Sequence, residues 1–387
     1  MAERFGDYQS EIYLRGLAGT KPPFTTDLAS LDTVAARSLT PETFAYIAGG
    51  AGSGATMRSN RAAFEKWKIV PRLLTNATER DLSTTVLGTE LSAPVLLAPI
   101  GAQSIMHPDA ELATARAAAS FGLPMILSTA GSRTIEEVAE ASPVAPRWFQ
   151  LYWPNDPDVC ASILDRARRA GYSVLVVTLD TWTLAWRPRD LDKAYLPFLR
   201  GEGVATPLSD PAFRARLPKP PEEDLAAALL LWTAIFSGTD FGWDQLSFLR
   251  DRWPGPIVLK GVQHVDDARR AADAGMDGIV VSNHGGRQVD GALGALEALP
   301  PIVRAVGSRI EVLFDSGVRN GADVIKALSL GAKAVLFGRP YAYGLALDGE
   351  EGVRHVLRCL LADLDITLGL SGHRTPHEVS PSVLHRS

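Results

Sequence analysis

The chain has few cysteines and no long apolar run, and these absences exclude several classes of protein. Its 387 residues contain only two cysteines, Cys160 and Cys359. Both fall in helical patterns, which argues against a disulfide framework and against a cysteine-based metal site. The longest apolar run, residues 225–236, is too short to span a bilayer. The first seven residues form no signal core, so we expect a cytoplasmic protein with no membrane partner.

The chain also lacks an excess of positive charge and several catalytic motifs. The net charge of -5 offers no basic footprint for nucleic acid. No cluster of Asp, Glu and His has the spacing of metal ligands, so we expect no metal. The Gly-x-Ser-x-Gly motif of serine hydrolases is absent. The glycine run at 49–54 follows a helical pattern rather than a strand, and therefore does not fit a dinucleotide-binding fingerprint.

What the chain does contain is a regular alternation of short apolar runs and helical patterns, beginning near residue 93. Three of the helical patterns end in a glycine shortly before the next apolar run, at Gly171, Gly275 and Gly331. Repeated β/α units with eight candidate strands predict an α/β fold, a (β/α)8 TIM barrel. A doubly wound open sheet is the alternative. The expected strands are residues 95–98, 125–127, 148–151, 174–178, 257–259, 279–281, 312–314 and 334–337.

We expect one domain over residues 1–387. Thr40 and Pro41 provide an N-cap and a first helical residue, which predicts a helix in the N-terminal part. The expected parts are an N-terminal arm with helices at 1–92, the barrel at 93–345, and a C-terminal helix and tail at 346–387.

A long insertion interrupts the barrel after the fourth strand, at about residues 183–253. It is rich in proline and carries mixed charge. A loop of this length in a compact domain is typical of a lid. An apolar helix at 225–236 and a second helix at 243–253 are expected to pack the insertion back onto the barrel.

Polar and unusual residues follow the predicted strands. In a (β/α)8 barrel the active site lies at the carboxyl ends of the strands. Capping explains any one of these residues, but not the whole set. In strand order they are Pro99, Ile100 and Gly101; Ser128; Gln150 and Tyr152; Thr178 and Asp180; Lys260; Ser282, His284 and Arg287; Asp315, Ser316, Gly317 and Arg319; and Gly338 and Arg339.

The central stretch is residues 282–288, Ser-Asn-His-Gly-Gly-Arg-Gln, after the sixth strand. His284 supplies a base that works near neutral pH, and Arg287 supplies a planar fork suited to a carboxylate. Asp180 is placed to orient and stabilise a protonated His284. Lys260 is placed to offset negative charge on a reduced cofactor.

The loops after the seventh and eighth strands have the composition of a phosphate site. Such loops commonly hold a phosphate through backbone N–H groups and a helix N-terminus. Residues 315–319 and 337–340 contribute two glycines and two arginines. The alternative is that both arginines are solvated or pair with acids. A phosphate-bearing organic cofactor, a histidine base, a lysine and carboxylate-binding arginines together predict redox chemistry on a hydroxy acid.

Residues 282–288 resemble the signature loop of the FMN-dependent α-hydroxy-acid oxidising enzymes. This family includes glycolate oxidase, lactate oxidase, flavocytochrome lactate dehydrogenase and lactate 2-monooxygenase. The resemblance runs from about Tyr46 to Tyr341. It extends to Phe44–Tyr46, Ala98–Gly101, Phe149–Tyr152, Thr178–Thr181, Leu259–Val262, Phe314–Gly317 and Gly338–Pro340.

The resemblance implies a role for each residue of the site. His284 would be the base, supported by Asp180, and Tyr152 would contact the substrate hydroxyl. Arg287, Arg187 and Tyr46 would hold the substrate carboxylate. Lys260 would lie near the flavin N1 and C2 carbonyl. The other residues implied to bind FMN are Ser128, Gln150 and Thr178 at the ring, Pro99, Ile100 and Gly101 at its N5 face, Arg319, Gly338 and Arg339 at the phosphate, Asp315 near the ribityl chain, and Ser282, Ser316 and Gly317.

Within the family, the arm at Gly6–Tyr13 and the stretch Trp186–Leu191 resemble lactate 2-monooxygenase. Gly101 does too, because simple oxidases of the family usually carry alanine there, and a glycine would leave room beside the flavin. The implied reaction is hydride transfer from L-lactate to FMN, followed by reaction with O2 to give acetate, carbon dioxide and water. A lid that slows release of the keto acid would favour this outcome.

Alternatives remain open at this stage. An oxidase would release the 2-keto acid and H2O2, and its substrate could exceed lactate in size. Ala130 stands where glycolate oxidase-like members have a bulky aromatic residue, whereas Trp182 replaces a common proline and would refill some space. An FMN-dependent isomerase and a non-catalytic flavin carrier are more remote. The resemblance implies a homo-oligomer, a tetramer or an octamer.

Overall fold

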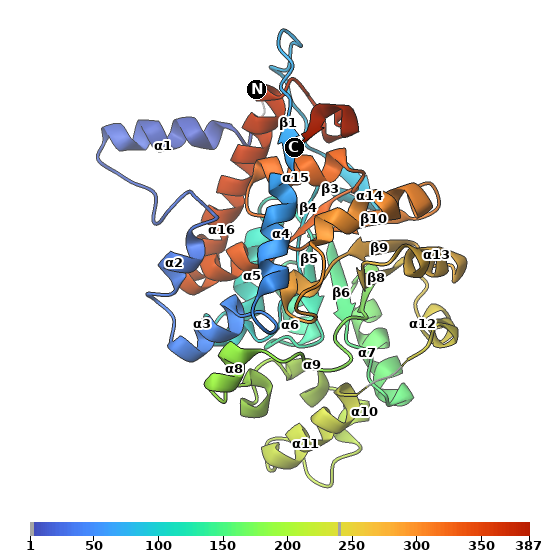
Figure 1. The fold of residues 1–387 in the computed structure, drawn as a ribbon. Coiled ribbons are helices and arrows are strands. Elements are labelled where there is room, and N and C mark those ends of the chain that lie inside the picture. Colours follow the sequence, from blue (N-terminus) through green and yellow to red (C-terminus); the bar gives the residue numbers. More distant parts are fainter. Residues whose placement is uncertain (1–3, 239–240) are drawn as a thin grey trace.

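Eight parallel strands close into a barrel at the centre of the molecule (Figure 1). The computed structural model describes residues 4–238 and 241–387. The last barrel strand pairs with the first, with Val335 opposite Val95 and Phe337 opposite Leu97. This confirms the predicted barrel and excludes the open sheet. The barrel strands are β4 (Val95–Leu97), β5 (Met125–Ser128), β6 (Arg147–Leu151), β7 (Val174–Thr178), β8 (Ile257–Val262), β9 (Gly278–Val281), β10 (Glu311–Phe314) and β11 (Val335–Phe337).

Helices on the outside of the barrel begin and end where the sequence provides caps. Asp156 accepts hydrogen bonds from the backbone N–H groups of Asp158 and Val159, with Pro157 at the first helical position. Gly171 and Gly275 follow their helices with φ of 79° and 73°, a conformation that glycine adopts readily. The outer helices are α5 (Ala110–Ala119), α6 (Ile135–Ala141), α7 (Pro157–Arg169), α13 (Val265–Asp273), α14 (Ala295–Val306), α15 (Gly321–Ser329) and α16 (Arg339–Leu370).

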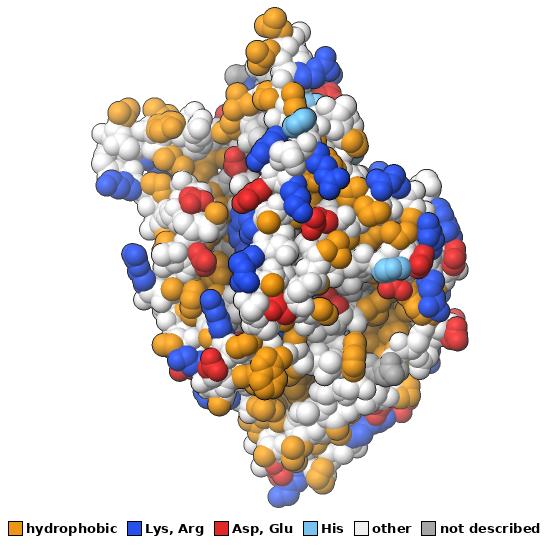
Figure 2. Space-filling view, in the orientation of Figure 1, with side chains coloured by type: hydrophobic (Ala, Val, Ile, Leu, Met, Phe, Trp, Pro, Cys, Tyr) orange, Lys and Arg blue, Asp and Glu red, His pale blue; other side chains and the backbone are white. Residues whose placement is uncertain are grey.

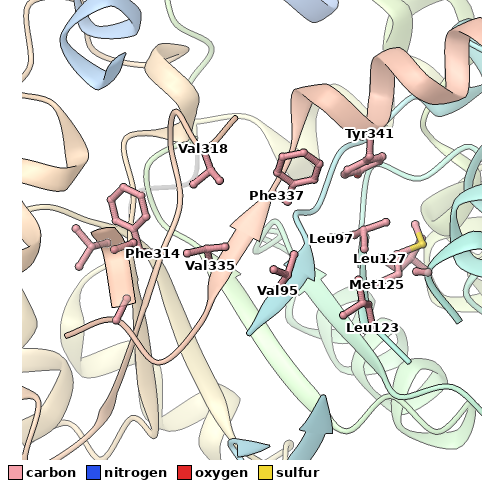
Figure 3. Packing of buried hydrophobic residues seen from close by; sticks show 14 of the residues in the cluster. Val95, Leu97, Leu123, Met125, Leu127, Phe314, Val318, Val335, Phe337 and Tyr341 are labelled. Atoms are coloured by element: carbon pink, nitrogen blue, oxygen red, sulfur yellow. The ribbon is translucent and has the colours of Figure 1, made fainter. Parts of the chain in front are cut away.

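The core has two parts because alternate side chains of each strand face opposite sides. Leu96 belongs to the cluster inside the barrel, whereas its neighbours Val95 and Leu97 pack outward against the helices. Figure 3 shows part of this outer layer, where Phe337 and Tyr341 lie near Leu97. A hairpin of β2 (Thr84–Val86) and β3 (Thr89–Leu91) adds side chains to the inner cluster. The interior of the barrel is therefore filled with side chains rather than open to a ligand.

The N-terminal part lies along the outside of the barrel. Thr40 caps the predicted helix by accepting a hydrogen bond from the Thr43 N–H at 3.2 Å. Strand β1 (Trp67–Ile69) pairs with β12 (Leu384–Arg386), which ties the two ends of the chain together. The helices of this part are α1 (Asp7–Leu17), α2 (Leu31–Ala35), α3 (Pro41–Ala48) and α4 (Ala55–Glu65).

The segment between β7 and β8 folds as short helices, at the lower end of Figure 1. The apolar helix expected at 225–236 is confirmed. The helix expected at 243–253 is wrong in part, because a 3-10 turn at Trp243–Gln245 precedes a shorter helix. The ring of Trp153 stacks on Phe241 at 4.3 Å between centroids, so this end of the segment packs on the barrel as expected. Its helices are α8 (Pro188–Asp192), α9 (Ala205–Leu208), α10 (Pro211–Arg214), α11 (Leu225–Phe236) and α12 (Leu246–Arg250).

The remaining regular elements are 3-10 turns at Gln103–Ile105, Pro197–Arg200, His284–Gly286, Pro376–Glu378 and Pro381–Val383. The division of residues 1–387 into one domain with the predicted boundaries stays a prediction. Within residues 4–238 and 241–387, no helix has the length and apolar character to cross a membrane. The face in Figure 2 carries basic and acidic side chains interspersed among apolar ones.

Candidate active site

A cavity of about 310 Å3 opens at the carboxyl ends of the barrel strands. It is walled on one side by strand ends and on the other by the segment between β7 and β8. Most of the predicted site residues line it together, although they come from distant parts of the sequence. Those lining it are Tyr46, Pro99, Ile100, Gly101, Tyr152, Arg187, Lys260, His284, Arg287, Asp315, Ser316, Gly317, Arg319, Gly338 and Arg339.

Five predicted residues lie behind this lining. Ser128 donates a hydrogen bond from Oγ to Gln150 Oε1 at 2.8 Å, and the buried Gln150 Nε2 has no partner among the described residues. Thr178 and Asp180 border a second, adjoining cavity. Ser282 accepts a hydrogen bond from Lys260. An unpaired buried amide donor is costly, so Gln150 fits a ligand that brings an acceptor.

His284 is held from its Nδ1 side. That atom lies 2.9 Å from Asp180 Oδ1 and 3.1 Å from Thr181 Oγ1. The backbone N–H of His284 donates to Ser282 Oγ, and its φ of 56° is unusual for a residue other than glycine. If Nδ1 carries the proton toward Asp180, Nε2 is the acceptor of the neutral ring. The arrangement therefore presents a base to the cavity.

Electrostatics keep His284 neutral and Asp180 ionised. Burial lowers the pKa of His284, and the neighbouring carboxylate of Asp180 offsets this effect only in part. Burial raises the pKa of Asp180, but His284 and Lys260 more than compensate, so that its pKa lies below the usual value. Near neutral pH the pair is a carboxylate beside an uncharged imidazole, which is ready to accept a proton.

Two arginines line the cavity with His284, and each has guanidinium N–H groups that make no hydrogen bond to the described residues. Arg287 donates from Nη1 to the backbone oxygens of Tyr46 and Gly49, and its guanidinium carbon lies 5.1 Å from the centre of the Tyr46 ring. Arg187 donates from Nε to the Arg287 oxygen and from Nη2 to Gln288 Oε1. Burial and the charge of Arg287 lower the pKa of Arg187 to about 10, so it is still a cation at neutral pH.

Lys260 is buried and charged. Its Nζ lies 3.1 Å from Asp315 Oδ2 and donates to Ser282 Oγ at 3.1 Å. Burial lowers the pKa of Lys260, but Asp315 and Asp180 more than offset this and raise it above the usual value. A fixed cation thus stands at the end of β8, where a ligand that gains negative charge would be stabilised.

The two predicted phosphate loops provide glycines, and arginines for which the described residues include no carboxylate ion-pair partner. Gly317 has φ of 103° and a Cβ there would meet Asn60 at 3.2 Å. Arg339 donates to the backbone oxygens of Ile47, Gly285 and Gly49, and burial lowers its pKa to about 9. Arg339 therefore also braces the walls of the site.

Four arginines of this cavity, Arg187, Arg287, Arg319 and Arg339, are buried or half-buried. Among the described residues none of them forms an ion pair with a carboxylate. This argues against the alternative that the arginines pair with acids. Buried cations that have no direct ion pair with a carboxylate fit anionic ligands, although Asp190 lies near enough to offset part of the fall that burial causes in the pKa of Arg187. Two lie beside His284 and two at the phosphate loops, so the residues present fit one carboxylate and one phosphate.

The space expected beside Gly101 is filled. A Cβ at this position would lie 2.6 Å from the backbone oxygen of Ala130 and 2.8 Å from its Cβ. The Ala102 N–H also donates to that oxygen at 2.9 Å, which fixes the approach of the two loops. The expectation that Gly101 leaves room is therefore wrong, because Ala130 takes the room. Glycine is required here for close packing.

Sequence reasoning gave no role to three features of the site. Thr181 donates to Asp180 Oδ1 at 2.9 Å, and Gln288 donates to the Asp180 backbone oxygen at 2.6 Å. Both belong to the quoted motifs, and their position next to predicted residues was the available signal. The third feature is an apolar wall from the inserted segment, which includes Phe198 and Trp232.

Comparison with known proteins identifies the class that this fold and site define. The family model described as FMN-dependent dehydrogenase matches residues 35–386. The FMN-dependent alpha-hydroxy acid dehydrogenase qulF of Penicillium citrinum is 49% identical over 386 residues, 99% of this chain and 96% of its own length. The L-lactate oxidase of Lysinibacillus sphaericus is 41% identical over 350 residues, 90% of each chain.

A crystal structure of mandelate oxidase superposes with a TM-score of 0.82 at 36% identity, covering 94% of this chain and 98% of the other. The chain belongs to the FMN-dependent dehydrogenase family, whose cofactor is FMN. The predicted family and cofactor are confirmed. The closer likeness to lactate 2-monooxygenase stays a prediction.

Proposed function

We propose that this chain oxidises an L-2-hydroxy acid to the 2-keto acid and passes the electrons to O2. The observation that carries the proposal is the juxtaposition of a neutral His284, paired with Asp180, and two arginines that form no ion pair with a carboxylate in the part of the chain that the structure describes. Bound FMN supplies the two-electron acceptor for this reaction. The named activities of the relatives, an L-lactate oxidase and a mandelate oxidase, support the same reaction class.

The substrate's two polar groups have separate partners in this scheme. Arg287 and Arg187 bind the carboxylate through their guanidinium groups. Burial raises the pKa of Tyr152, which keeps its hydroxyl protonated and able to donate a hydrogen bond to the substrate hydroxyl. His284 Nε2 accepts the hydroxyl proton as the C–H bond is oxidised, and Asp180 stabilises the resulting imidazolium.

The remaining predicted residues hold the cofactor. Gln150 provides its unpaired amide N–H to the flavin ring, with Ser128 fixing the orientation of that amide. Arg319, Arg339 and the glycines of the two loops hold the phosphate. Lys260 remains a cation and stabilises negative charge that develops at the ring. These assignments are those that the resemblance to the family implies, and the donors present at each place are compatible with them.

The 2-keto acid formed in this reaction has two possible fates. Release of the 2-keto acid with H2O2 is the first, because Ala130 occupies the space beside Gly101 on which the other outcome depended. Oxidative decarboxylation of L-lactate to acetate, carbon dioxide and water is the second, and it is supported by the segment that covers the cavity. We also expect a cytoplasmic homo-oligomer, a tetramer or an octamer.

Anaerobic flavin reduction tests the proposal. The holoenzyme is mixed without oxygen with a panel of L-2-hydroxy acids that includes L-lactate, and the flavin absorbance is followed. Bleaching by an L-acid but not by its D-enantiomer is expected, and His284→Asn should abolish it. In air, acetate is then assayed against keto acid and H2O2. A flavin that no 2-hydroxy acid reduces would refute the proposal and would leave an isomerase or a flavin carrier.

A further inference from the structure

One part of the cavity lining is used neither by the polar groups of a 2-hydroxy acid nor by FMN. It consists of apolar side chains from the segment between β7 and β8, chiefly Leu196, Phe198, Trp232 and Phe236. We propose that this wall binds the side chain of the substrate, and that the substrate is a 2-hydroxy acid bearing an aromatic ring. The inference rests on the proposed function and specifies its substrate class.

The wall is built from aromatic rings that contact one another. The ring of Trp232 lies 5.2 Å from that of Phe198 and 6.2 Å from that of Phe236, measured between centroids. The ring of Tyr46 meets Phe198 edge-on at 6.3 Å. Edge-on and offset arrangements are those in which aromatic rings attract each other. A further ring from a substrate would extend the same stack.

Helix α11 explains how these side chains reach the cavity. The helix is apolar around its whole circumference, and Ala228, Leu229 and Ile235 are buried. Trp232 and Phe236 lie one turn apart on the same face and line the cavity, where they remain half-buried. A half-buried aromatic pair that faces a cavity retains apolar surface for a ligand to cover.

The wall is fixed against the barrel. A Cβ on Gly203 would lie 2.8 Å from the Ala130 oxygen and 2.9 Å from the Phe198 ring, so the inserted segment approaches the barrel closely there. The backbone N–H of Ala205 donates to the Gly131 oxygen at 3.0 Å.

Helix α11 is tied to the barrel as well, because the backbone N–H of Asn155 donates to the Ile235 oxygen at 2.9 Å. The wall is therefore held in place by contacts that do not involve a substrate. A preformed apolar site loses less entropy on binding than a flexible one.

Size distinguishes an aromatic acid from lactate. The carboxylate and hydroxyl of either acid would occupy the arginines, Tyr152 and His284. The methyl of lactate would then touch only a small part of the wall and leave Trp232 and Phe236 in contact with water. Ala130, which lines the same cavity, contributes only a methyl group and leaves more space than a bulky residue would at that position. A phenyl group would cover the exposed apolar surface.

The experiment compares kcat/KM for L-lactate, L-mandelate and L-3-phenyllactate. For the native holoenzyme, the higher of the kcat/KM values for L-mandelate and L-3-phenyllactate is expected to exceed that for L-lactate by at least about tenfold. Trp232→Ala is expected to reduce that preference about tenfold or more. Phe236→Leu retains an apolar side chain, protects the fold, and should reduce the preference by a smaller factor. Leu230→Ala is the matched control, because Leu230 lies on the same helix but is 73% exposed and away from the cavity.

The outcomes separate this inference from the proposed function. If no hydroxy acid reduces the flavin, the proposed function fails. If lactate is preferred by the native enzyme, the function stands and the aromatic subsite is wrong. If Trp232→Ala and Phe236→Leu both bind FMN but leave the preference unchanged, the wall is structural. If Leu230→Ala lowers the preference as much as Trp232→Ala, the effect is a general one of helix α11 and the inference is overturned.

Discussion

The imidazole Nδ1 of His284 lies 2.9 Å from Oδ1 of Asp180, across 104 positions of the sequence. Asp180 follows β7 and His284 follows β9, so the closed barrel brings the two residues together. The hydroxyl of Thr181 lies within hydrogen-bond distance of both. The pair favours the tautomer that turns Nε2 away from Asp180, and under the proposed function it sets the pH range in which His284 acts as a base.

Replacement of Asp180 by asparagine should shift the acidic limb of the pH profile to lower pH. Burial already lowers the pKa of His284, and Asp180 counteracts this, so removing the carboxylate lowers that pKa further. The plateau of kcat/KM should fall about 100-fold or more, because the imidazolium loses its counter-charge. Measurement of kcat/KM from acidic to neutral pH checks both effects.

Thr181→Val provides the comparison for Asp180→Asn. It removes one hydrogen bond but retains the carboxylate, so a smaller loss with an unshifted acidic limb is expected. An acidic limb that moves to higher pH in Asp180→Asn would contradict the assigned role of the pair.

The substitution Arg187→Lys or Arg287→Lys should strongly raise the KM for the 2-hydroxy acid. Each guanidinium is positioned by backbone or amide oxygens, and a point charge cannot make those bonds and also bind a carboxylate in a forked geometry. Loss of about 100-fold in kcat/KM corresponds to one charged hydrogen-bonding group. Steady-state kinetics with an L-2-hydroxy acid would measure it.

Arg189→Lys is the matched control for these substitutions. Arg189 lies two positions from Arg187 but is exposed, so its kinetics should equal those of the native enzyme. Equal losses at Arg189 and Arg187 would show that the effect comes from the fold of this segment.

The sequence alone was enough to predict the barrel and to identify most of the residues that line the cavity at its end. Most barrel strands contain a short apolar run of three or four residues, as expected of strands buried on both faces, and the polar residues lie mostly at the strand ends. Once the strands close into a barrel, their carboxyl ends must meet, so residues such as Lys260 and His284 could be expected in one cavity. Contacts fixed by the tertiary fold were not readable. The approach of Ala130 to Gly101 and the position of Trp232 depend on how separate loops pack.

Alanine at Gly101 should destabilise the protein before it alters the chemistry. The added methyl would lie 2.6 Å from the Ala130 oxygen, so the two loops at the cavity wall must separate. We expect a loss of about 1–3 kcal/mol in the free energy of unfolding, together with weaker FMN retention. Urea unfolding and flavin content measure these. Normal stability combined with a changed ratio of acetate to keto acid would instead support the expectation that Gly101 leaves room beside the flavin.

The substitution Glu111→Gln should remove one source of the pH dependence of the free energy of unfolding. Glu111 is buried in α5, accepts hydrogen bonds from the N–H groups of Ser132 and Gln103, and has one carboxyl oxygen without a partner among the described residues. Burial raises its pKa to about 7, whereas an unfolded glutamate titrates near ~4.3. Between these values the folded chain binds more protons than the unfolded chain, so its stability falls as pH rises.

The loss attributable to Glu111 is on the order of 3 kcal/mol once the pH exceeds the folded pKa. Glu111→Gln cannot ionise and retains an oxygen that accepts the Ser132 N–H. The free energy of unfolding of the variant, relative to that of the native protein, should therefore increase as pH rises from about 5 to about 8. Glu140→Gln, at an exposed position, changes the net charge equally, and its free energy of unfolding should depend on pH in the same way as that of the native protein. Urea unfolding at fixed pH values makes the comparison, and parallel curves for Glu111→Gln would show that Glu111 is ionised throughout this range.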